Sequence, residues 1–144
     1  MKIGIGNDHR GVELKNKITN YLNKKYEVIN YGTDTLDTVD YPVIAFKVSE
    51  EVRDKNIDLG ILICGTGIGM SIAANKVHGI RCAKINTIND AHFAKEHNNA
   101  NVLAIANNID IELIKQMLDE FLKTKFNTTP KYTYRNEMLD KYGC

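Results

Sequence analysis

The sequence predicts an α/β protein with a doubly wound, Rossmann-like, five-stranded parallel sheet between two layers of helices, a three-layer α/β/α arrangement. Short apolar runs of strand length alternate five times with segments whose apolar residues recur at helical spacing, and the connections are short. The chain has 144 residues with neither an internal repeat nor a long linker, so residues 1–144 are expected to form a single domain.

The expected strands are short apolar runs that end at polar or glycine-rich segments. The run at residues 59–64 (LGILIC) is the most hydrophobic stretch of the chain, and it is too short for a core helix. A strand that is buried on both faces explains it best. The expected strands cover residues 3–6, 26–31, 59–64, 80–85 and 101–105.

Helices are expected where apolar residues recur every three or four positions. Leu14, Ile18 and Leu22 mark the first helix. The second begins near Pro42, because proline suits the first turn of a helix. The other expected helices cover residues 71–77, 90–96 and 113–121, and a short one runs from Tyr134 onward.

Composition and charge argue against several classes of function. The chain is 43% hydrophobic and 26% charged with a formal net charge of +1, so it has no overall field that attracts nucleic acid. No segment approaches the roughly 20 apolar residues of a membrane helix, and the N-terminus turns polar too early for a secretory signal. We expect a cytoplasmic protein with no nucleic-acid or membrane partner, whose cysteines, Cys64, Cys82 and Cys144, are free thiols.

The first candidate site is the segment Cys64-Gly65-Thr66-Gly67-Ile68-Gly69, which lies between the most buried strand and a helix. In a doubly wound sheet, ligands bind at the carboxyl ends of the strands. Glycines let backbone N–H groups approach a ligand, and a helix start favours an anionic oxygen or a thiolate. The alternatives are a plain tight turn and a dinucleotide loop, although the next strand lacks the terminal acid that a dinucleotide loop needs.

Two histidine pairs are weaker candidates. Asp8 and His9 follow the first strand and could bind phosphate or move protons, or Asp8 could simply cap the next helix. His97 and Asn98 precede the last strand, where the helix dipole also favours a histidine. His92 and His97 are five residues apart, which does not suit one helix face, so no metal site is expected.

The C-terminal segment is basic. Lys131 and Arg135 are four residues apart and could align two cations on one helix face. Such cations could bind phosphate, or they could serve only to keep the surface solvated.

Together these segments resemble the type B ribose-5-phosphate isomerase family, which includes the galactose-6-phosphate isomerase subunits. The matches keep their order and spacing over nearly the whole chain, and the middle one is highly specific. They are residues 5–9 (IGNDH), 40–42 (DYP), 61–76 (ILICGTGIGMSIAANK), 79–81 (GIR) and 97–103 (HNNANVL). The resemblance implies a homodimer or homotetramer with active sites at the dimer interface, a tail (about 127–144) packed on a partner subunit, and no metal or organic cofactor.

The resemblance also implies roles for individual residues. Cys64 would be the base that moves a proton between C1 and C2 of a sugar phosphate, and Thr66 would help to move the hydroxyl proton. His97, assisted by Asp8, would open the furanose ring. The residues expected to bind the sugar, its phosphate or the enediolate oxygens are His9, Tyr41, Gly65, Gly67, Gly69, Met70, Asn98, Lys131 and Arg135.

Two departures from the family pattern leave the sugar open. Relatives usually carry arginine where this chain has Asn108 and Lys131. Lysine meets phosphate only as a point charge. The leading prediction is an aldose–ketose isomerase that interconverts ribose 5-phosphate and ribulose 5-phosphate through an enediolate. The alternatives are a hexose-6-phosphate isomerase of the allose or galactose type and a non-catalytic sugar-phosphate-binding regulator.

Overall fold

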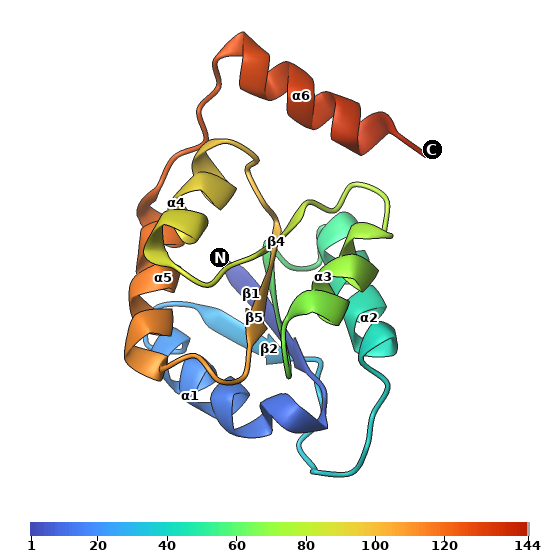
Figure 1. Ribbon diagram of the computed structural model, residues 1–144, viewed down its shortest axis with the longest axis vertical. Coiled ribbons are helices and arrows are strands. Elements are labelled where there is room, and N and C mark those ends of the chain that lie inside the picture. The colour runs from blue at the N-terminus through green and yellow to red at the C-terminus, as the bar shows by residue number, and fades with distance from the viewer. Residues whose placement is uncertain (144) are drawn as a thin grey trace.

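The computed structural model describes residues 1–143, so Cys144 and the end of the predicted tail lie outside the described residues. Over this range five strands form one sheet in the order β2-β1-β3-β5-β4 (Figure 1). All neighbouring strands pair in parallel, which confirms the predicted doubly wound sheet. The strands are β1 (Lys2–Asn7), β2 (Glu27–Asn30), β3 (Leu59–Cys64), β4 (Cys82–Lys84) and β5 (Val102–Ala106).

Helices cover both faces of the sheet and complete the three predicted layers (Figure 1). Each face has its own cluster of buried apolar side chains. One cluster lies beneath α2 (Tyr41–Arg53) and α3 (Ile68–Asn75). The other lies beneath α1 (Val12–Leu22), α4 (Ile88–Glu96) and α5 (Ile111–Lys123).

The alternation of isoleucine and glycine in β1 shows how the sequence sets these layers. Ile3 and Ile5 are fully buried in the cluster beneath α1 and α5. Gly6 faces the other way, where a Cβ would lie 2.7 Å from Ile44 Cγ2 and 2.8 Å from Val48 Cγ2. Glycine therefore lets α2 pack directly on the backbone of β1.

Two helices begin three or four residues earlier than the sequence predicts, α3 at residue 68 rather than 71 and the tail helix at residue 130 rather than 134. The predicted helix at 71–77 is α3, which begins at Ile68 because Gly67 adopts a φ of 77° that turns the chain straight into the helix. The tail helix, α6 (Pro130–Lys141), begins before residue 134 because the fixed φ of proline suits the first turn even where apolar spacing is absent. In Figure 1, α6 projects beyond one end of the sheet. None of the helices within residues 1–143 is both long and apolar enough to cross a membrane.

The contact between α2 and β1 can be tested by substitution. We expect Gly6→Ala to lower the free energy of unfolding by about 1–3 kcal/mol, because the added methyl group overpacks this contact. Val48→Ala removes one of the opposing methyl groups and so makes room for the methyl group added at position 6. The double substitution should therefore lower the free energy of unfolding by less than the two single substitutions added together, with a difference of at least about 0.5 kcal/mol. Urea unfolding of the four proteins measures this coupling. Strict additivity would contradict direct packing of α2 on β1.

Candidate active site

Cys64 is the last residue of β3, the central strand, in which every residue is buried. It is 5% exposed, and the Gly67 N–H donates a hydrogen bond of 3.1 Å to its Sγ. Gly67 has a φ of 77°, so the turn that directs this N–H at the sulfur favours glycine. The sulfur of Cys64 therefore lies beside a backbone N–H donor and the N-terminus of α3.

The loop also offers unpaired backbone donors beside the sulfur. Its Ile68 N–H donates to Thr66 Oγ1 at 3.2 Å, and its Gly67 N–H donates to the sulfur. In this loop, the N–H groups of Gly65, Thr66, Gly69 and Met70 have no acceptor among residues 1–143. Such donors suit an anionic oxygen. The Met70 side chain is fully buried in the core, so this residue can offer a ligand only its backbone.

An open cavity of about 390 Å³ lies over this loop. Tyr41, at the start of α2, closes one side of it: a Cβ on Gly69 would lie 2.6 Å from Tyr41 Cζ, so the ring lies directly against the glycine. Asp8 reaches the cavity from the end of β1. The lining residues are Asp8, Arg10, Tyr41, Cys64, Gly65, Thr66, Ile68, Gly69 and Ile72. The structure thus brings many of the predicted residues into one cavity.

His9 is oriented from the loop that precedes α2. The Val39 N–H donates to His9 Nδ1 at 3.2 Å, so a neutral imidazole carries its proton on Nε2. Asp8 Oδ1 accepts the Arg10 N–H at 2.9 Å and caps a short 3-10 helix, His9–Gly11. The capping role that the sequence offered as an alternative is therefore present, and it coexists with the place of Asp8 in the cavity.

The other predicted site residues lie at the opposite edge of the sheet. His97 follows α4 and precedes β5, whereas Cys64 pairs with Ala106 at the far end of β5. The strand has five residues, and at about 3.3 Å per residue its ends lie roughly 13 Å apart. Within one chain, His97 therefore meets neither Cys64 nor its expected helper Asp8. Asn98 adjoins His97, and α6 at the same edge carries two exposed cations, Lys131 and Arg135.

Stacking and hydrogen bonds hold α6 to His97. The His97 ring stacks on Tyr132 with centroids 4.7 Å apart. Asn136, which is 6% exposed, donates to the carbonyl oxygens of His97 at 2.9 Å and of Tyr132 at 3.0 Å. Its Oδ1 accepts a bond of 3.1 Å from Asn98 Nδ2. This buried amide fixes the position of α6 against the turn that holds His97 and Asn98.

The sequence did not single out Arg10 as a residue of the cavity. Its guanidinium lies over Gly65, where a Cβ would lie 2.5 Å from Arg10 Cζ. The available signal was an arginine directly after Asp8 and His9, at the carboxyl end of a strand. Exposed arginines are common on surfaces, and nothing local shows where this side chain points.

Cys82 differs sharply from Cys64. Both are free thiols, but burial raises the pKa of Cys82 to about 12. Cys82 therefore stays protonated near neutral pH, and Cys64 is the better candidate for a base. No group of three or more His, Cys, Asp or Glu side chains within residues 1–143 is arranged to hold a metal ion.

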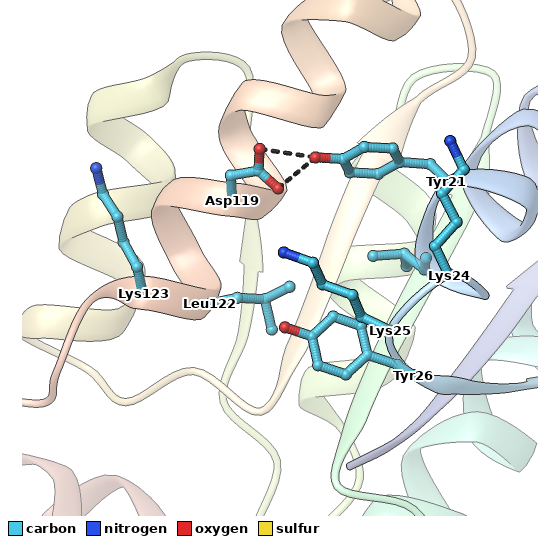
Figure 2. Close-up of a pocket in the computed structure, with 8 residues that line it drawn as sticks. Tyr21, Lys24, Lys25, Tyr26, Asp119, Leu122 and Lys123 are labelled. Atoms are coloured by element: carbon cyan, nitrogen blue, oxygen red, sulfur yellow. Dashed lines mark hydrogen bonds between the residues drawn. The ribbon is translucent and has the colours of Figure 1, made fainter.

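A separate pocket of about 330 Å³ lies between α1 and α5 (Figure 2). The Tyr21 hydroxyl lies 2.6 and 2.7 Å from the two carboxylate oxygens of Asp119, and this hydrogen bonding raises the pKa of Tyr21 to about 12. The other lining residues are Leu22, Lys24, Lys25, Tyr26, Leu122 and Lys123. This pocket contains none of the predicted site residues.

Comparison with known proteins identifies the family of the chain. The sequence model of the Ribose/Galactose Isomerase family matches residues 3–139. The chain belongs to this family. A member of the Ribose/Galactose Isomerase family is a sugar phosphate isomerase, so the resemblance found in the sequence is confirmed.

Three relatives show how far the family likeness extends. A Rickettsia typhi protein, named provisionally as a sugar phosphate isomerase, is 48% identical over 126 residues, which cover 86% of this chain and 88% of that protein. Galactose-6-phosphate isomerase subunit LacB of Clostridium acetobutylicum is 42% identical over 131 residues, covering 90% of this chain and 76% of LacB. The structure of Clostridium thermocellum Ribose-5-Phosphate Isomerase B is 44% identical with a TM-score of 0.93, covering 97% of this chain and 95% of that one.

Asn136 attaches α6 together with the ion pair of 2.6 Å between Arg81 and Asp140, and the share of Asn136 can be tested directly. We expect Asn136→Ala to loosen α6 while the sheet stays folded, because the substitution removes hydrogen bonds to His97, Tyr132 and Asn98. Hydrogen exchange should show protection of α6 falling by about tenfold or more, with β1, β3 and β5 unchanged. The exposed neighbour Glu137→Ala is the matched control. Full protection of α6 in Asn136→Ala would show that other contacts hold this helix.

Proposed function

We propose that the chain interconverts ribose 5-phosphate and ribulose 5-phosphate through an enediolate, with Cys64 as the base. One observation carries the proposal: Cys64 Sγ accepts the Gly67 N–H and faces an open cavity whose loop also holds unpaired N–H donors. A base beside oxyanion donors is what proton transfer next to a carbonyl requires. Membership in a family of sugar phosphate isomerases supports the reaction class.

The proposed reaction begins with the open-chain aldose. The Cys64 thiolate takes the proton from C2, and the electron pair moves into the C1–C2 bond and onto O1. The loop N–H groups stabilise the enediolate oxygens, and one such donor is worth about 2.7–4 kcal/mol. The Thr66 hydroxyl, whose oxygen already accepts the Ile68 N–H, carries the proton that moves from O2 to O1. Cys64 then returns its proton to C1 while the carbonyl forms at C2, and the product is the ketose.

A hexose 6-phosphate is the second candidate substrate. A galactose-6-phosphate isomerase subunit is 42% identical to this chain. This chain also carries Asn108 and Lys131 where the family pattern has arginines that bind phosphate. A non-catalytic regulator has less support, since Cys64 keeps its N–H donor and its cavity.

A substrate panel decides among these functions. Pentose 5-phosphates and hexose 6-phosphates are assayed for aldose–ketose interconversion without added metal. The highest kcat/KM for ribose 5-phosphate would support the proposal, and a preference for allose or galactose 6-phosphate would replace it with the hexose reaction. Binding of sugar phosphates without turnover would favour the regulator.

We also propose that a second copy of the chain completes the active site, in a homodimer or a dimer of dimers. Cys64 and His97 lie at opposite edges of the same sheet, so one chain cannot bring them together. Rotating a second copy about a two-fold axis can place His97 of each chain beside Cys64 of the other. His97 would then open the furanose ring with Asp8, and Asn98 would line the sugar site with Tyr41.

Exposed apolar side chains support this pairing. Ile68 and Ile72 beside the cavity are 54% and 59% exposed, and on α6 Tyr134, Met138 and Leu139 are 65%, 55% and 57% exposed. Large apolar side chains gathered on a surface mark interaction sites. Packing α6 of one chain near the cavity of the other would bury both groups and would bring Lys131 and Arg135 toward the phosphate.

The role of Cys64 predicts a contrast between two cysteines. We expect Cys64→Ala to lower kcat for ribose 5-phosphate by about 10²-fold or more, the scale for losing a general base. Cys82→Ala is the matched control and should keep its activity, because the Cys82 thiol is held protonated by burial. Steady-state kinetics of both variants make the test. Turnover near wild type in Cys64→Ala would remove this residue from the mechanism.

The shared site predicts complementation between inactive subunits. Cys64→Ala and His97→Ala should each be impaired alone, but a co-expressed mixture should recover about a quarter of wild-type activity, because half of randomly paired dimers are mixed and each has one intact site. The control mixes Cys64→Ala with Thr66→Ala. Cys64 and Thr66 line the same cavity of one chain, so each of the two cavities in this mixed dimer carries one defect and no site is restored. Absence of recovery with His97→Ala would contradict a site built from two chains.

A further inference from the structure

The backbone of Arg10 is fixed relative to Cys64. Its N–H donates to Asp8 Oδ1 at 2.9 Å, and its carbonyl oxygen accepts a bond of 2.9 Å from Asn107 Nδ2. The Asn107 N–H in turn donates to the carbonyl oxygen of Cys64 at 2.9 Å. Arg10 is therefore tied both to the tip of β1 and to the tips of β3 and β5, and its side chain starts from a fixed point beside the cavity.

The side chain of Arg10 crosses the loop at its smallest residue. A Cβ on Gly65 would lie 2.5 Å from Arg10 Cζ, so the guanidinium can take this path only because residue 65 is glycine. From there it lines the cavity together with Cys64 and Tyr41. The cation thus lies over the residue that directly follows the proposed base.

No carboxylate within residues 1–143 forms an ion pair with Arg10. Glu13 and Asp110 line an adjoining groove with Arg10, but Glu13 pairs with Lys17 at 3.2 Å and Asp110 accepts a backbone N–H of α5 at 3.1 Å. Arg53, by contrast, is paired with its neighbour Asp54. A placed guanidinium without an anion is suited to bind one from solution.

We propose that Arg10 binds the phosphate group of the substrate, from the same subunit that supplies Cys64. The planar fork of donors on arginine matches two phosphate oxygens at once, which a lysine cannot do. This inference rests on the proposed function for the sugar phosphate substrate. With the reacting carbons at Cys64 and the phosphate at Arg10, the distance between these two residues determines how many carbons of the sugar can lie between the reacting carbons and the phosphate. Arg10 is then a specificity-determining residue for the length of the sugar.

The test compares Arg10→Ala and Arg10→Lys with the wild type. For Arg10→Ala we expect KM for ribose 5-phosphate to rise by about tenfold or more, the effect of losing a charged hydrogen bond. The ratio of kcat/KM for ribose 5-phosphate to that for unphosphorylated ribose should fall by the same factor. Arg10→Lys should recover part of the loss, and Arg53→Ala, whose guanidinium faces Asp54, should match the wild type.

A binding measurement separates this inference from the proposed function. Calorimetry gives the Kd of inorganic phosphate for the wild type and for Arg10→Ala without any turnover, and we expect it to rise in the variant by about tenfold. If the wild type does not isomerise ribose 5-phosphate, the proposed function fails, while the change in phosphate Kd still decides the role of Arg10. An unchanged phosphate Kd would overturn the inference. So would an equal fall in kcat on phosphorylated and unphosphorylated sugars, which would assign Arg10 to the chemistry at Cys64.

Discussion

The parallel pairing of β3 with β1 and β5 is the constraint on which the rest of the structure depends. It brings the carboxyl ends of three strands to one edge of the sheet. There the Asp8 N–H donates to the carbonyl oxygen of Ile63 at 3.2 Å, and the Asn107 N–H donates to that of Cys64 at 2.9 Å. The backbone is thus held on both sides just where the turn begins. On that fixed base, Gly67 can direct its N–H at the sulfur while the N–H groups of Gly69 and Met70 stay unpaired.

Under the proposed function, the same pairing keeps one chain from completing the site alone. A parallel sheet places the residues that enter a strand and those that leave it at opposite edges, and β5 separates His97 from Cys64 in this way. No rotation of side chains spans that distance. The buried amide of Asn136 fixes α6 at the same far edge as His97. The turn that holds His97 and the helix that carries Lys131 and Arg135 are therefore joined, and under the proposal of a shared site they would reach a second subunit together.

The sequence predicts the strands well because each carries its own signal, and β3, buried on both faces, reads as an unbroken apolar run. The start of α3 could not be predicted by apolar spacing, since it depends on the backbone of Gly67. That Asp8 and Cys64 line one cavity was predictable, because the ends of parallel strands meet at one edge. The place of Arg10 was not predictable, because its backbone carbonyl oxygen is held by Asn107, which is 97 positions away in the sequence. The placement of His97 across the sheet likewise follows from strand order, which no local pattern contains.

Under these proposals, the phosphate is held by groups from two chains, with Arg10 and His9 from the subunit of the base and Lys131 and Arg135 from α6 of the other. The neutral side chain of Asn108 adds no charge, and Lys131 offers no fork, so the forked contacts come from the two arginines. A ligand that bridges two chains binds the pair better than either chain alone. Its binding must therefore stabilise the pair by the same free energy that pairing adds to its affinity. Dimer stability and phosphate affinity are then two measures of one coupling. Because a sugar without phosphate lacks the anion for these cations, the coupling depends on phosphate. The thiol and the loop amides act instead on the first two carbons and their oxygens, which every aldose shares.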